Sequence, residues 1–555
     1  MAMAATAGGV PRPMTREDRK VILASSVGTI FEWYDFYLAG ALAVNISANF
    51  FSGVNPTAGF IFTLLGFAAG FAVRPFGALF FGSLGDLIGR KYTFLVTMTL
   101  MGISTFVVGL IPSYASIGFA APVVFILCRL IQGLALGGEY GGAATYVAEH
   151  APHGRRGFYT SWIQTTATVG LFLSLIVVLL LRVNLAAEQF AVWGWRVPFL
   201  VSVLLLGISI WIRLQLEESP AFKRIKDEGK HSKTPLREAF GRWENAKVAL
   251  FALLGGTAGQ AVVWYCGQFY ALFFLTQTLK LDGTTANIVI AAALAIGTPF
   301  FVLFGWLSDK IGRKPIILAG CLLAVVTYFP LFSALTNAVN PALEQALEKS
   351  PVVVTADPNE CSFQFNPTGT ASFTTSCDVA KSFLATNSVN YSNVAAPAGT
   401  VATIKIGDKV VTSFDKAKAG ADAAAKTKAF SAEATAAIRA AGYPASADPA
   451  KVNRAMTILI LTILVIYVTM VYGPIAAMLV ELFPTRIRYS GMSLPYHIGN
   501  GWFGGFLPPT AFAIVAATGN IYSGLWYPIV VAGMTFVVGL LFVPETKDRD
   551  IYVND

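Results

Sequence analysis

A ten-residue motif occurs twice in this chain, and each copy lies between two long apolar runs. GSLGDLIGRK at Gly82–Lys91 reappears as GWLSDKIGRK at Gly305–Lys314. In both copies an apolar run ends close to an aspartate, a glycine follows, and Arg-Lys starts the next run. A match of this length at the same place in two hydropathy patterns predicts a chain of two related halves, both embedded in a membrane.

Apolar segments of membrane-spanning length recur along the whole chain. Hydrophobic residues make up 55% of the sequence and charged residues only 13%, whereas a soluble domain carries about 25% charged residues. Only helices or closed barrels satisfy the backbone in lipid, and these segments are too long for barrel strands. Residues 1–19 are polar and basic and do not resemble a signal peptide. We predict an all-α membrane protein with twelve spans, at residues 20–46, 57–84, 91–111, 121–147, 157–183, 196–215, 247–278, 285–307, 315–336, 454–480, 489–514 and 521–543.

Basic residues are distributed unevenly over the loops. With a cytoplasmic N-terminus, the short inside loops hold Arg90, Lys91, Arg155, Arg156, Lys310, Arg313, Lys314, Arg486 and Arg488, and the short outside loops hold Arg182, Arg196 and Lys280. The positive-inside rule then puts both termini in the cytoplasm, as expected for a multi-pass protein of a bacterial inner membrane. This topology explains the net charge of +9 without nucleic-acid binding.

The spacing of two further matching segments reveals an insertion. Glu149 and Glu481 lie in corresponding segments 332 residues apart, while the two motif copies are 223 residues apart. About 109 additional residues therefore lie between the second motif and span 10, and the polar stretch 337–453 is the part without a membrane-length apolar run. Residues 400–414 alternate around Gly407-Asp408, which predicts a β-hairpin, and the Ala-rich stretch 415–441 predicts a helix.

The predicted topology places this α+β insertion outside the cytoplasm. Cys361 and Cys377 are its two cysteines, and a disulfide between them is allowed in that compartment; the alternative is two unpaired thiols. Cys128, Cys266 and Cys321 lie in predicted spans and are expected to be packing residues. The insertion could be a cap, a partner-docking module or a tolerated addition, and the sequence does not decide among these.

The predicted organisation has six segments. They are an N-terminal six-helix half at 1–215, a cytoplasmic linker at 216–246, helices 7–9 of the second half at 247–336, the insertion at 337–453, helices 10–12 at 454–543, and a cytoplasmic tail at 544–555.

Ionisable residues inside the spans are few and are candidate functional groups. Glu32 and Asp35 are three residues apart, so they share one face of span 1 near the middle of the membrane. Two carboxylates this close in a low dielectric should not both ionise easily, so at least one could carry a proton. Glu139 in span 4 is a third candidate for proton coupling. The alternative is a structural ion pair with an arginine of another span.

Two arginines lie at a similar depth, Arg74 in span 2 and Arg129 in span 4. An arginine keeps its proton and presents a planar fork that suits a carboxylate. Arg74 and Arg129 could therefore bind an anionic substrate or neutralise the acids. Further candidate substrate contacts in the first half are Tyr34, Gln132 and Gln164.

The predicted spans of the second half hold almost no charge. Gln260, Trp264 and Gln268 recur at four-residue spacing and would line one stripe of span 7, and Asn500 in span 11 is a further candidate substrate contact. Ordinary packing is the alternative for each aromatic residue. His497, about one turn into span 11, is interpreted as structural.

Several motifs together resemble the major facilitator superfamily and, within it, the metabolite:H⁺ symporter family. The motifs are FEWYDFY (31–37), RPFGALFFGSLGDLIGRK (74–91), RLIQGLALGGEYGGAATYVAEH (129–150), WGWRVPF (193–199), LEESPAF (216–222) and ELFPTRIRYSG (481–491). The resemblance covers the whole chain except the insertion. It implies two halves that rock about a central site.

The resemblance also implies residue roles. Asp86, Arg90, Asp309 and Arg313 match a cytoplasmic gate, to which we add Glu149 and Glu481, and Asp35 with Arg129 resembles a proton-coupling pair. We therefore expect a proton-coupled symporter for a small organic acid or a zwitterionic osmolyte. The alternatives are an exporter of the same fold and a transporter-like sensor that uses the insertion.

Other expectations concern cofactors and partners. No nucleotide loop, metal-ligand cluster or nucleophile triad is recognisable, so we expect no enzyme activity, no metal and no cofactor other than the proton gradient. The expected partners are a small-molecule substrate, protons and membrane lipid. We expect a monomer and no nucleic acid, and the insertion is a candidate docking site for a partner.

Overall fold

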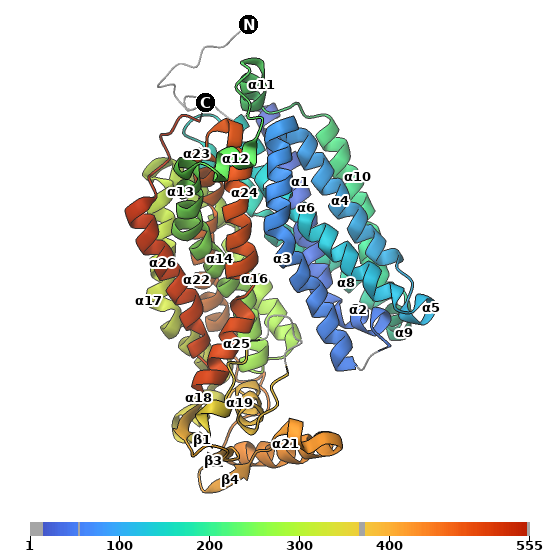
Figure 1. Cartoon of the computed structure of the whole chain (residues 1–555), viewed down its shortest axis with the longest axis vertical. Coiled ribbons are helices and arrows are strands. Elements are labelled where there is room, and N and C mark those ends of the chain that lie inside the picture. Colours follow the sequence, from blue (N-terminus) through green and yellow to red (C-terminus); the bar gives the residue numbers. More distant parts are fainter. Residues whose placement is uncertain (1–14, 54–55, 366–371, 552–555) are drawn as a thin grey trace.

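The chain is predominantly helical and forms two bundles and a small added unit (Figure 1). The computed structural model describes residues 15–53, 56–365 and 372–551. The first bundle contains α1 Arg16–Ala41, α2 Ala43–Phe50, α3 Pro56–Ile88, α4 Arg90–Leu110, α5 Tyr114–Ile117, α6 Ala120–His150, α7 Arg156–Gln164, α8 Thr166–Asn184, α9 Ala187–Val192 and α10 Val197–Leu214. Two short helices, α11 Pro220–Asp227 and α12 Pro235–Phe240, lie between the bundles in the sequence.

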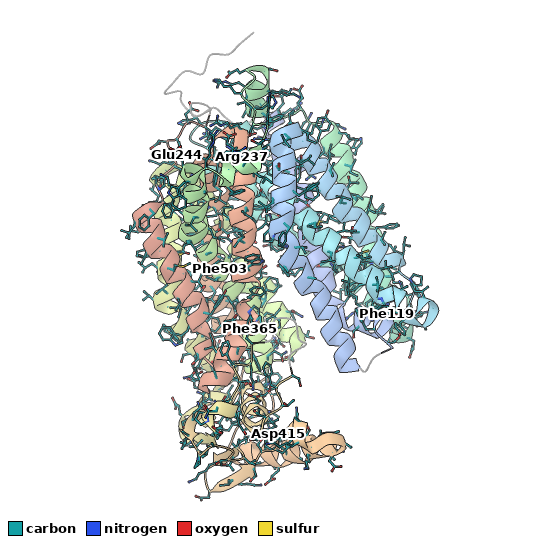
Figure 2. The ribbon with its side chains drawn as sticks, viewed as in Figure 1. Phe119, Arg237, Glu244, Phe365, Asp415 and Phe503 are labelled. Atoms are coloured by element: carbon teal, nitrogen blue, oxygen red, sulfur yellow. A yellow bond between two sulfur atoms is a disulfide. The ribbon has the colours of Figure 1, made fainter. Side chains whose placement is uncertain are left out.

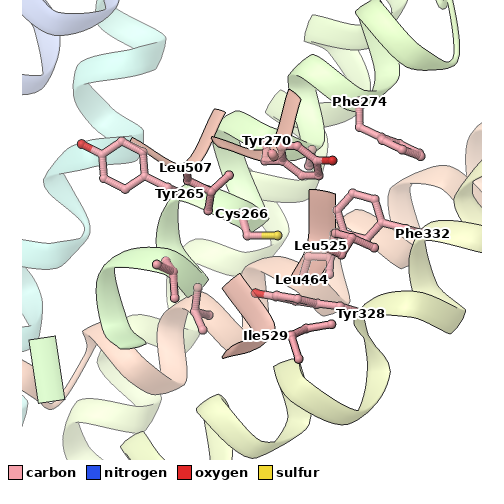
Figure 3. Packing of buried hydrophobic residues seen from close by; sticks show 14 of the residues in the cluster. Tyr265, Cys266, Tyr270, Phe274, Tyr328, Phe332, Leu464, Leu507, Leu525 and Ile529 are labelled. Carbon is pink, nitrogen blue, oxygen red and sulfur yellow. The ribbon is translucent and has the colours of Figure 1, made fainter. Parts of the chain in front are cut away.

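The second bundle contains several interrupted helices. Its α-helices are α13 Trp243–Ala252, α14 Ala258–Tyr265, α15 Ala271–Phe273, α16 Gly283–Ile311, α17 Arg313–Val339, α22 Arg454–Tyr472, α23 Ile475–Leu482, α24 Arg488–Ile498, α25 Leu507–Thr518 and α26 Trp526–Phe542. Its π-helical segments are η2 Leu253–Thr257, η3 Cys266–Tyr270, η4 Phe274–Thr278 and η8 Gly499–Gly504. Figure 3 shows the core of this bundle, where Tyr270, Phe274 and Phe332 pack ring against ring.

Ten helices in the described part of the chain are long and apolar enough to cross a membrane. The predicted spans 20–46 and 489–514 are not among them. The first corresponds to α1, which contains Glu32 and Asp35. The second is divided, because α24 ends at Ile498, a π-helical segment follows, and α25 begins only at Leu507. The count of twelve therefore stays a prediction.

The two motif copies form equivalent helix-turn-helix corners, as the sequence predicts. Between α3 and α4, Gly89 has φ +124°, and between α16 and α17, Gly312 has φ +113°. Residues other than glycine rarely adopt a positive φ of this size. A Cβ at Gly89 would also lie 2.2 Å from Oε2 of Glu218, and one at Gly312 would lie 2.4 Å from Oε2 of Glu545. Glycine at both positions thus allows a sharp turn and close approach of a carboxylate.

The two bundles meet through matching helix pairs. Helix α3 of the first bundle packs on α24 of the second, and α16 of the second packs on α7 of the first. In Figure 1 the ribbons of the bundles lie close together at the end that carries both motif corners, and they diverge toward the end that carries the added unit. We call these the latch end and the insert end.

The added unit is a small α/β fold. It contains α18 Pro341–Lys349, β1 Val352–Ala356, α19 Ser376–Thr386, β2 Tyr391–Ala395, β3 Thr403–Ile406, β4 Lys409–Thr412, α20 Lys416–Ala419 and α21 Ala423–Ala440. The strand order is β2-β1-β3-β4, with β1 and β2 parallel and the other pairs antiparallel. The predicted hairpin is confirmed, since Ile406 pairs with Lys409. The predicted helix is present but is interrupted at Gly420, which has φ +54°.

Hydrogen bonds attach this unit to the ends of the second bundle. Lys280 Nζ donates to the carbonyl of Thr386 at 2.6 Å, and the Tyr391 amide donates to the carbonyl of Gly519 at 2.7 Å. Phe365, seen at the boundary in Figure 2, contacts the ring of Phe506. The unit is therefore fixed to the loops that follow η4 and α25.

A disulfide joins Cys361 to Cys377, with the Cα atoms 5.2 Å apart. It closes a loop of 16 residues, for which chain-entropy arguments give about 3 kcal/mol of stabilisation. Replacing both cysteines by serine should therefore make the added unit open more often, by about a hundredfold. Cleavage of the unit by a protease under native conditions would measure this. Equal cleavage rates in the variant and the unchanged protein would contradict it.

Candidate functional site

At the latch end, an acid of the first bundle caps a helix of the second. Asp86, at the end of α3, accepts hydrogen bonds from the Tyr489 amide at 3.2 Å and the Ser490 amide at 2.9 Å. The Ser490 hydroxyl adds a third bond at 2.8 Å. These amides belong to the first turn of α24, where backbone N–H groups lack helical partners. A carboxylate there also interacts favourably with the helix dipole.

The second bundle supplies the corresponding cap to the first. Asp309, at the end of α16, accepts hydrogen bonds from the amides of Gly157 at 2.9 Å and Phe158 at 2.8 Å, in the first turn of α7. Arg313 pairs with Asp309 at 2.7 Å, as Arg90 pairs with Asp86 at 3.1 Å. The predicted gate residues of each motif thus lie where the bundles touch.

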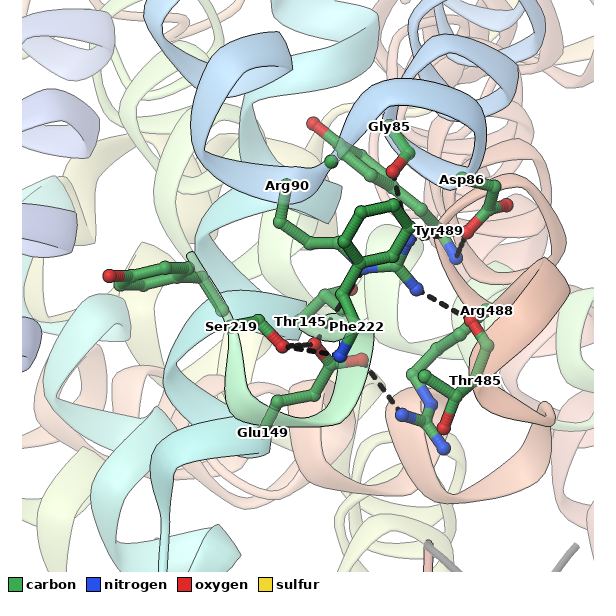
Figure 4. A network of polar contacts seen from close by, with 12 residues as sticks. Gly85, Asp86, Arg90, Thr145, Glu149, Ser219, Phe222, Thr485, Arg488 and Tyr489 are labelled. Atoms are coloured by element: carbon green, nitrogen blue, oxygen red, sulfur yellow. Dashed lines mark hydrogen bonds and ion pairs between the residues drawn. The ribbon is translucent and has the colours of Figure 1, made fainter. Parts of the chain in front are cut away.

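A second acid in each bundle lies between two arginines. Glu149 accepts a hydrogen bond from Arg488 of the other bundle at 2.8 Å and lies 3.7 Å from Arg90 of its own (Figure 4). Glu481 pairs with Arg313 of its own bundle at 3.0 Å and with Arg156 of the other at 3.5 Å. All of these side chains are at most 1% exposed.

We call these eight residues the latch network. Its members are Asp86, Arg90, Glu149, Arg156, Asp309, Arg313, Glu481 and Arg488, and their charges sum to zero. Two arginines, Arg156 and Arg488, were missed as site residues in the sequence analysis. A signal was present, because each follows its glutamate by seven residues and the pair is 332 residues apart, like Glu149 and Glu481.

Two more acids were missed as well. Glu218 accepts hydrogen bonds from the amides of Arg90 and Lys91, and Glu545 accepts them from the amides of Arg313 and Lys314. Each caps the first turn of the helix that follows its motif glycine. The neighbouring hydroxyls of Ser219 and Thr546 donate to Glu149 and Glu481. The repeat therefore extends into the linker and the C-terminal segment.

A separate buried ion pair lies inside the first bundle. Arg129 Nη1 is 3.1 Å from Asp35 Oδ2 and donates to Gln132 Oε1 at 2.6 Å. Gln132 in turn donates to the Thr105 hydroxyl at 2.9 Å. Asp35 and Arg129 are 3% and 5% exposed. The structure thus brings together three predicted residues from α1 and α6.

Arg74 is also buried, but its surroundings differ. Its guanidinium lies 4.4 Å above the ring of Phe71, and its Nε has no hydrogen-bond partner among the described residues. No ion pair to Arg74 occurs in the described part of the chain. An arginine held over a ring and without a carboxylate can still accept an anionic ligand.

Glu139 and Tyr34 lie in other surroundings than Asp35. Glu139 is fully buried and interacts electrostatically with Arg213. It lies ten residues along α6 from Arg129, about 15 Å. Tyr34 lies in the core of the first bundle and donates to the Pro198 carbonyl at 2.8 Å. The side chain of Glu32 lies outside the described residues.

Aromatic and amide side chains join the bundles at mid-height. Gln164 donates to the hydroxyl of Tyr140 at 2.7 Å, and the Tyr140 ring stacks on Tyr496 with centroids 3.7 Å apart. The ring centroids of Trp33 in the first bundle and Trp264 in the second are 4.9 Å apart. These contacts bring Gln164 and Trp264 to the interface between the bundles.

The predicted amides of the second bundle form a pair. Gln260 and Asn500 exchange hydrogen bonds of 3.2 and 3.1 Å. Gln268 is 6% exposed and lies about two turns along the same interrupted helix from Gln260. The second bundle thus presents neutral polar groups, in contrast to the charges of the first.

Comparison with protein families matches most of the chain. The family described as "Sugar (and other) transporter" matches residues 20–252 and 429–553, and the one described as "MFS/sugar transport protein" matches residues 142–487. The first match skips most of the added unit. These matches place the chain in a class of multi-helix transporter families.

Relatives of known name support the same conclusion. The proline/betaine transporter of Salmonella typhimurium is 36% identical over 332 residues, 58% of this chain and 65% of that protein. The shikimate transporter and the alpha-ketoglutarate permease of Escherichia coli are each 35% identical and are covered to 72% and 74%. The chain spans slightly less than two thirds of the proline/betaine transporters it matches. It belongs to the major facilitator superfamily.

Solved structures share the fold. The proton:xylose symporter XylE bound to 6-bromo-6-deoxy-D-glucose aligns with a TM-score of 0.63 at 16% identity, over 97% of this chain and 98% of that chain. An inward open conformation of XylE from E. coli aligns with a TM-score of 0.51 over 96% and 98%.

Removing one helix cap should loosen the latch end. Asp86→Asn and Asp309→Asn each take a charge from a buried network, which costs about 1–3 kcal/mol, so the separated form should gain about tenfold in population. Labelling of a cysteine introduced at Ser161, which is fully buried against Gly305, would measure this. Glu217→Gln is the control, because the Glu217 carboxylate is exposed and pairs with Lys223 on the linker side. Unchanged labelling in both Asp variants would contradict the prediction.

Proposed function

We propose that the chain is a proton-coupled symporter for a small molecule that carries a carboxylate, working by alternating access. The observation that carries this proposal is the buried pair Asp35–Arg129 in the first bundle. An exporter and a sensor are the alternatives, and no contact among the described residues favours either.

Asp35 is the member of the pair that can exchange a proton. An arginine keeps its charge at any physiological pH, so only the carboxylate can change state. When Asp35 is ionised, the pair is neutral; when it is protonated, Arg129 carries an uncompensated charge in a low dielectric. Substrate and proton occupancy can be linked through this charge. Gln132 would hold the Arg129 guanidinium in place during the change.

Arg74 is the better candidate to bind the substrate directly. Arg129 already has a carboxylate partner, whereas Arg74 contacts a ring. The names of the relatives mention four compounds: proline, betaine, shikimate and alpha-ketoglutarate. These compounds are chemically diverse, but each carries a carboxylate. A group common to all of them is what a buried arginine fork recognises.

The latch network would serve as the cytoplasmic gate. With both caps made, the bundles are held together at the latch end, so a bound substrate would exchange only with the insert end. Opening of the latch end requires Asp86 and Asp309 to leave the helix termini that they cap. The pseudo-symmetric pairing supports a single concerted change.

The orientation in the membrane is part of the proposal. We place twelve spans with both termini and the latch end in the cytoplasm and the insertion 337–453 outside. The basic residues of the latch-end loops agree with the positive-inside rule. A disulfide in the insertion suits an oxidising compartment. We expect the protein to work as a monomer.

Transport by an Asp35 variant would test the coupling. Purified protein in liposomes, with an acidic exterior, would be supplied with labelled proline, glycine betaine, shikimate or alpha-ketoglutarate. We expect the unchanged protein to concentrate at least one of them. Asp35→Asn should lose accumulation but keep exchange of substrate for substrate, since Asn cannot carry the proton.

The exposed Glu217→Gln variant is the matched control and should accumulate normally. If Asp35→Asn still concentrates substrate against a gradient, Asp35 is not the coupling group. If the unchanged protein moves none of the four compounds, the proposed substrate class is wrong.

A further inference from the structure

His497 is buried without the partners that a structural histidine normally has. It lies in the last turn of α24, is 1% exposed, and neither ring nitrogen has a hydrogen bond to any described residue. The ring contacts the edge of Tyr496, with centroids 5.1 Å apart. Because buried polar groups are almost always hydrogen-bonded, an unpartnered imidazole requires an explanation. The structural role inferred from sequence does not supply one.

Two close contacts fix how α24 and the π-helical segment η8 that follows it lie along α3. A Cβ at Gly82 would lie 3.0 Å from Cα of Ser490, and a Cβ at Gly501 would lie 3.1 Å from the carbonyl oxygen of Phe71. Eleven residues separate the two points on each helix, so the helices run antiparallel and in step. The backbones are this close because glycine occupies both positions.

This register places Arg74 and His497 at a similar height along the two bundles. Arg74 precedes Gly82 by eight residues, and His497 follows Ser490 by seven. At 1.5 Å per residue the two lie about 12 and 10 Å from the same crossing point, so they are at nearly the same height. Arg74 is also the charged group that acts electrostatically on His497.

The two side chains belong to different bundles, and each has at least one nitrogen atom without a hydrogen-bond partner among the described residues. Arg74 is 9% exposed and its Nε is unpartnered among the described residues, like both His497 nitrogens. No hydrogen bond joins the two side chains, since both His497 nitrogens are unpartnered among the described residues. An anion between them would satisfy both, because a neutral imidazole offers one N–H donor and a guanidinium offers several.

We infer that Arg74 and His497 form a carboxylate-binding subsite that spans the two bundles. One carboxylate oxygen accepts from Arg74 on α3, and the other accepts from the His497 ring on α24. This deepens the proposed function and rests on it for the transported carboxylate. Both contacts exist only while α3 and α24 stay in register, so ligand binding and the arrangement of the bundles depend on each other.

Binding to purified protein would test this, with L-proline, glycine betaine, shikimate and alpha-ketoglutarate as probes. Pyrrolidine and choline, which lack the carboxylates of proline and betaine, are the matched controls. His497→Phe keeps ring size but removes both nitrogens, whereas His497→Gln keeps a donor. We expect His497→Phe to weaken carboxylate binding by about 10- to 100-fold, and His497→Gln to stay within about threefold.

The double variant Arg74→Gln/His497→Phe distinguishes one shared ligand group from two independent effects. If both residues hold the same carboxylate, the double variant should weaken binding by a factor clearly smaller than the product of the factors for the two single variants. Thermal midpoints of the unliganded variants would show that each is folded. Choline and pyrrolidine should bind neither the unchanged protein nor the variants appreciably.

Three outcomes would overturn the inference. If a probe binds the unchanged protein and His497→Phe equally well, His497 has no part in binding, and the proposed function can still stand on Arg74. If choline or pyrrolidine binds as well as its parent compound, the subsite does not recognise carboxylates. If no probe binds the unchanged protein, the inference and the substrate class of the proposed function fail together.

Discussion

Each bundle of this protein contributes a carboxylate that caps a helix of the other bundle. Asp86 accepts the first-turn amides of α24, and Asp309 accepts those of α7. Helix termini that are buried without such acceptors are costly, so the two bundles cannot separate at the latch end without exposing these amides to another partner. The sharp turns at Gly89 and Gly312 place the capping ends of α3 and α16 at this interface.

The scaffold is symmetric, but the chemistry at its centre is not. Both bundles have the same corner, the same glutamate between two arginines and the same terminal acid. At mid-height the first bundle has an aspartate paired with an arginine, whereas the second has Gln260 bonded to Asn500. Among the described residues, a buried acid–arginine pair at this height occurs in the first bundle, while the latch network joins both bundles.

Much of this arrangement was predictable because it is repeated or locally encoded. The duplicated motif predicted the two halves and their corners, and alternation around Gly407-Asp408 predicted the β3–β4 hairpin. Other features depend on tertiary context. The capping roles of Glu218 and Glu545 require segments more than 120 residues apart in sequence to meet. Adjacent residues on a helix point about 100° apart. The side chain of Tyr34 therefore lies in the core of the first bundle, whereas that of its neighbour Asp35 pairs with Arg129. The break between α24 and α25 arises from a π-helical turn that hydropathy alone does not reveal.

The attachment of the added unit to only one bundle has a practical consequence. Bonds from Lys280 and Tyr391 tie it to loops of the second bundle, and it has no counterpart on the first. A transporter of two similar helical halves offers few features by which particle images can be oriented in electron cryomicroscopy. Here the molecule carries its own fiducial mark, which removes the two-fold ambiguity and would report directly how far one half rotates relative to the other.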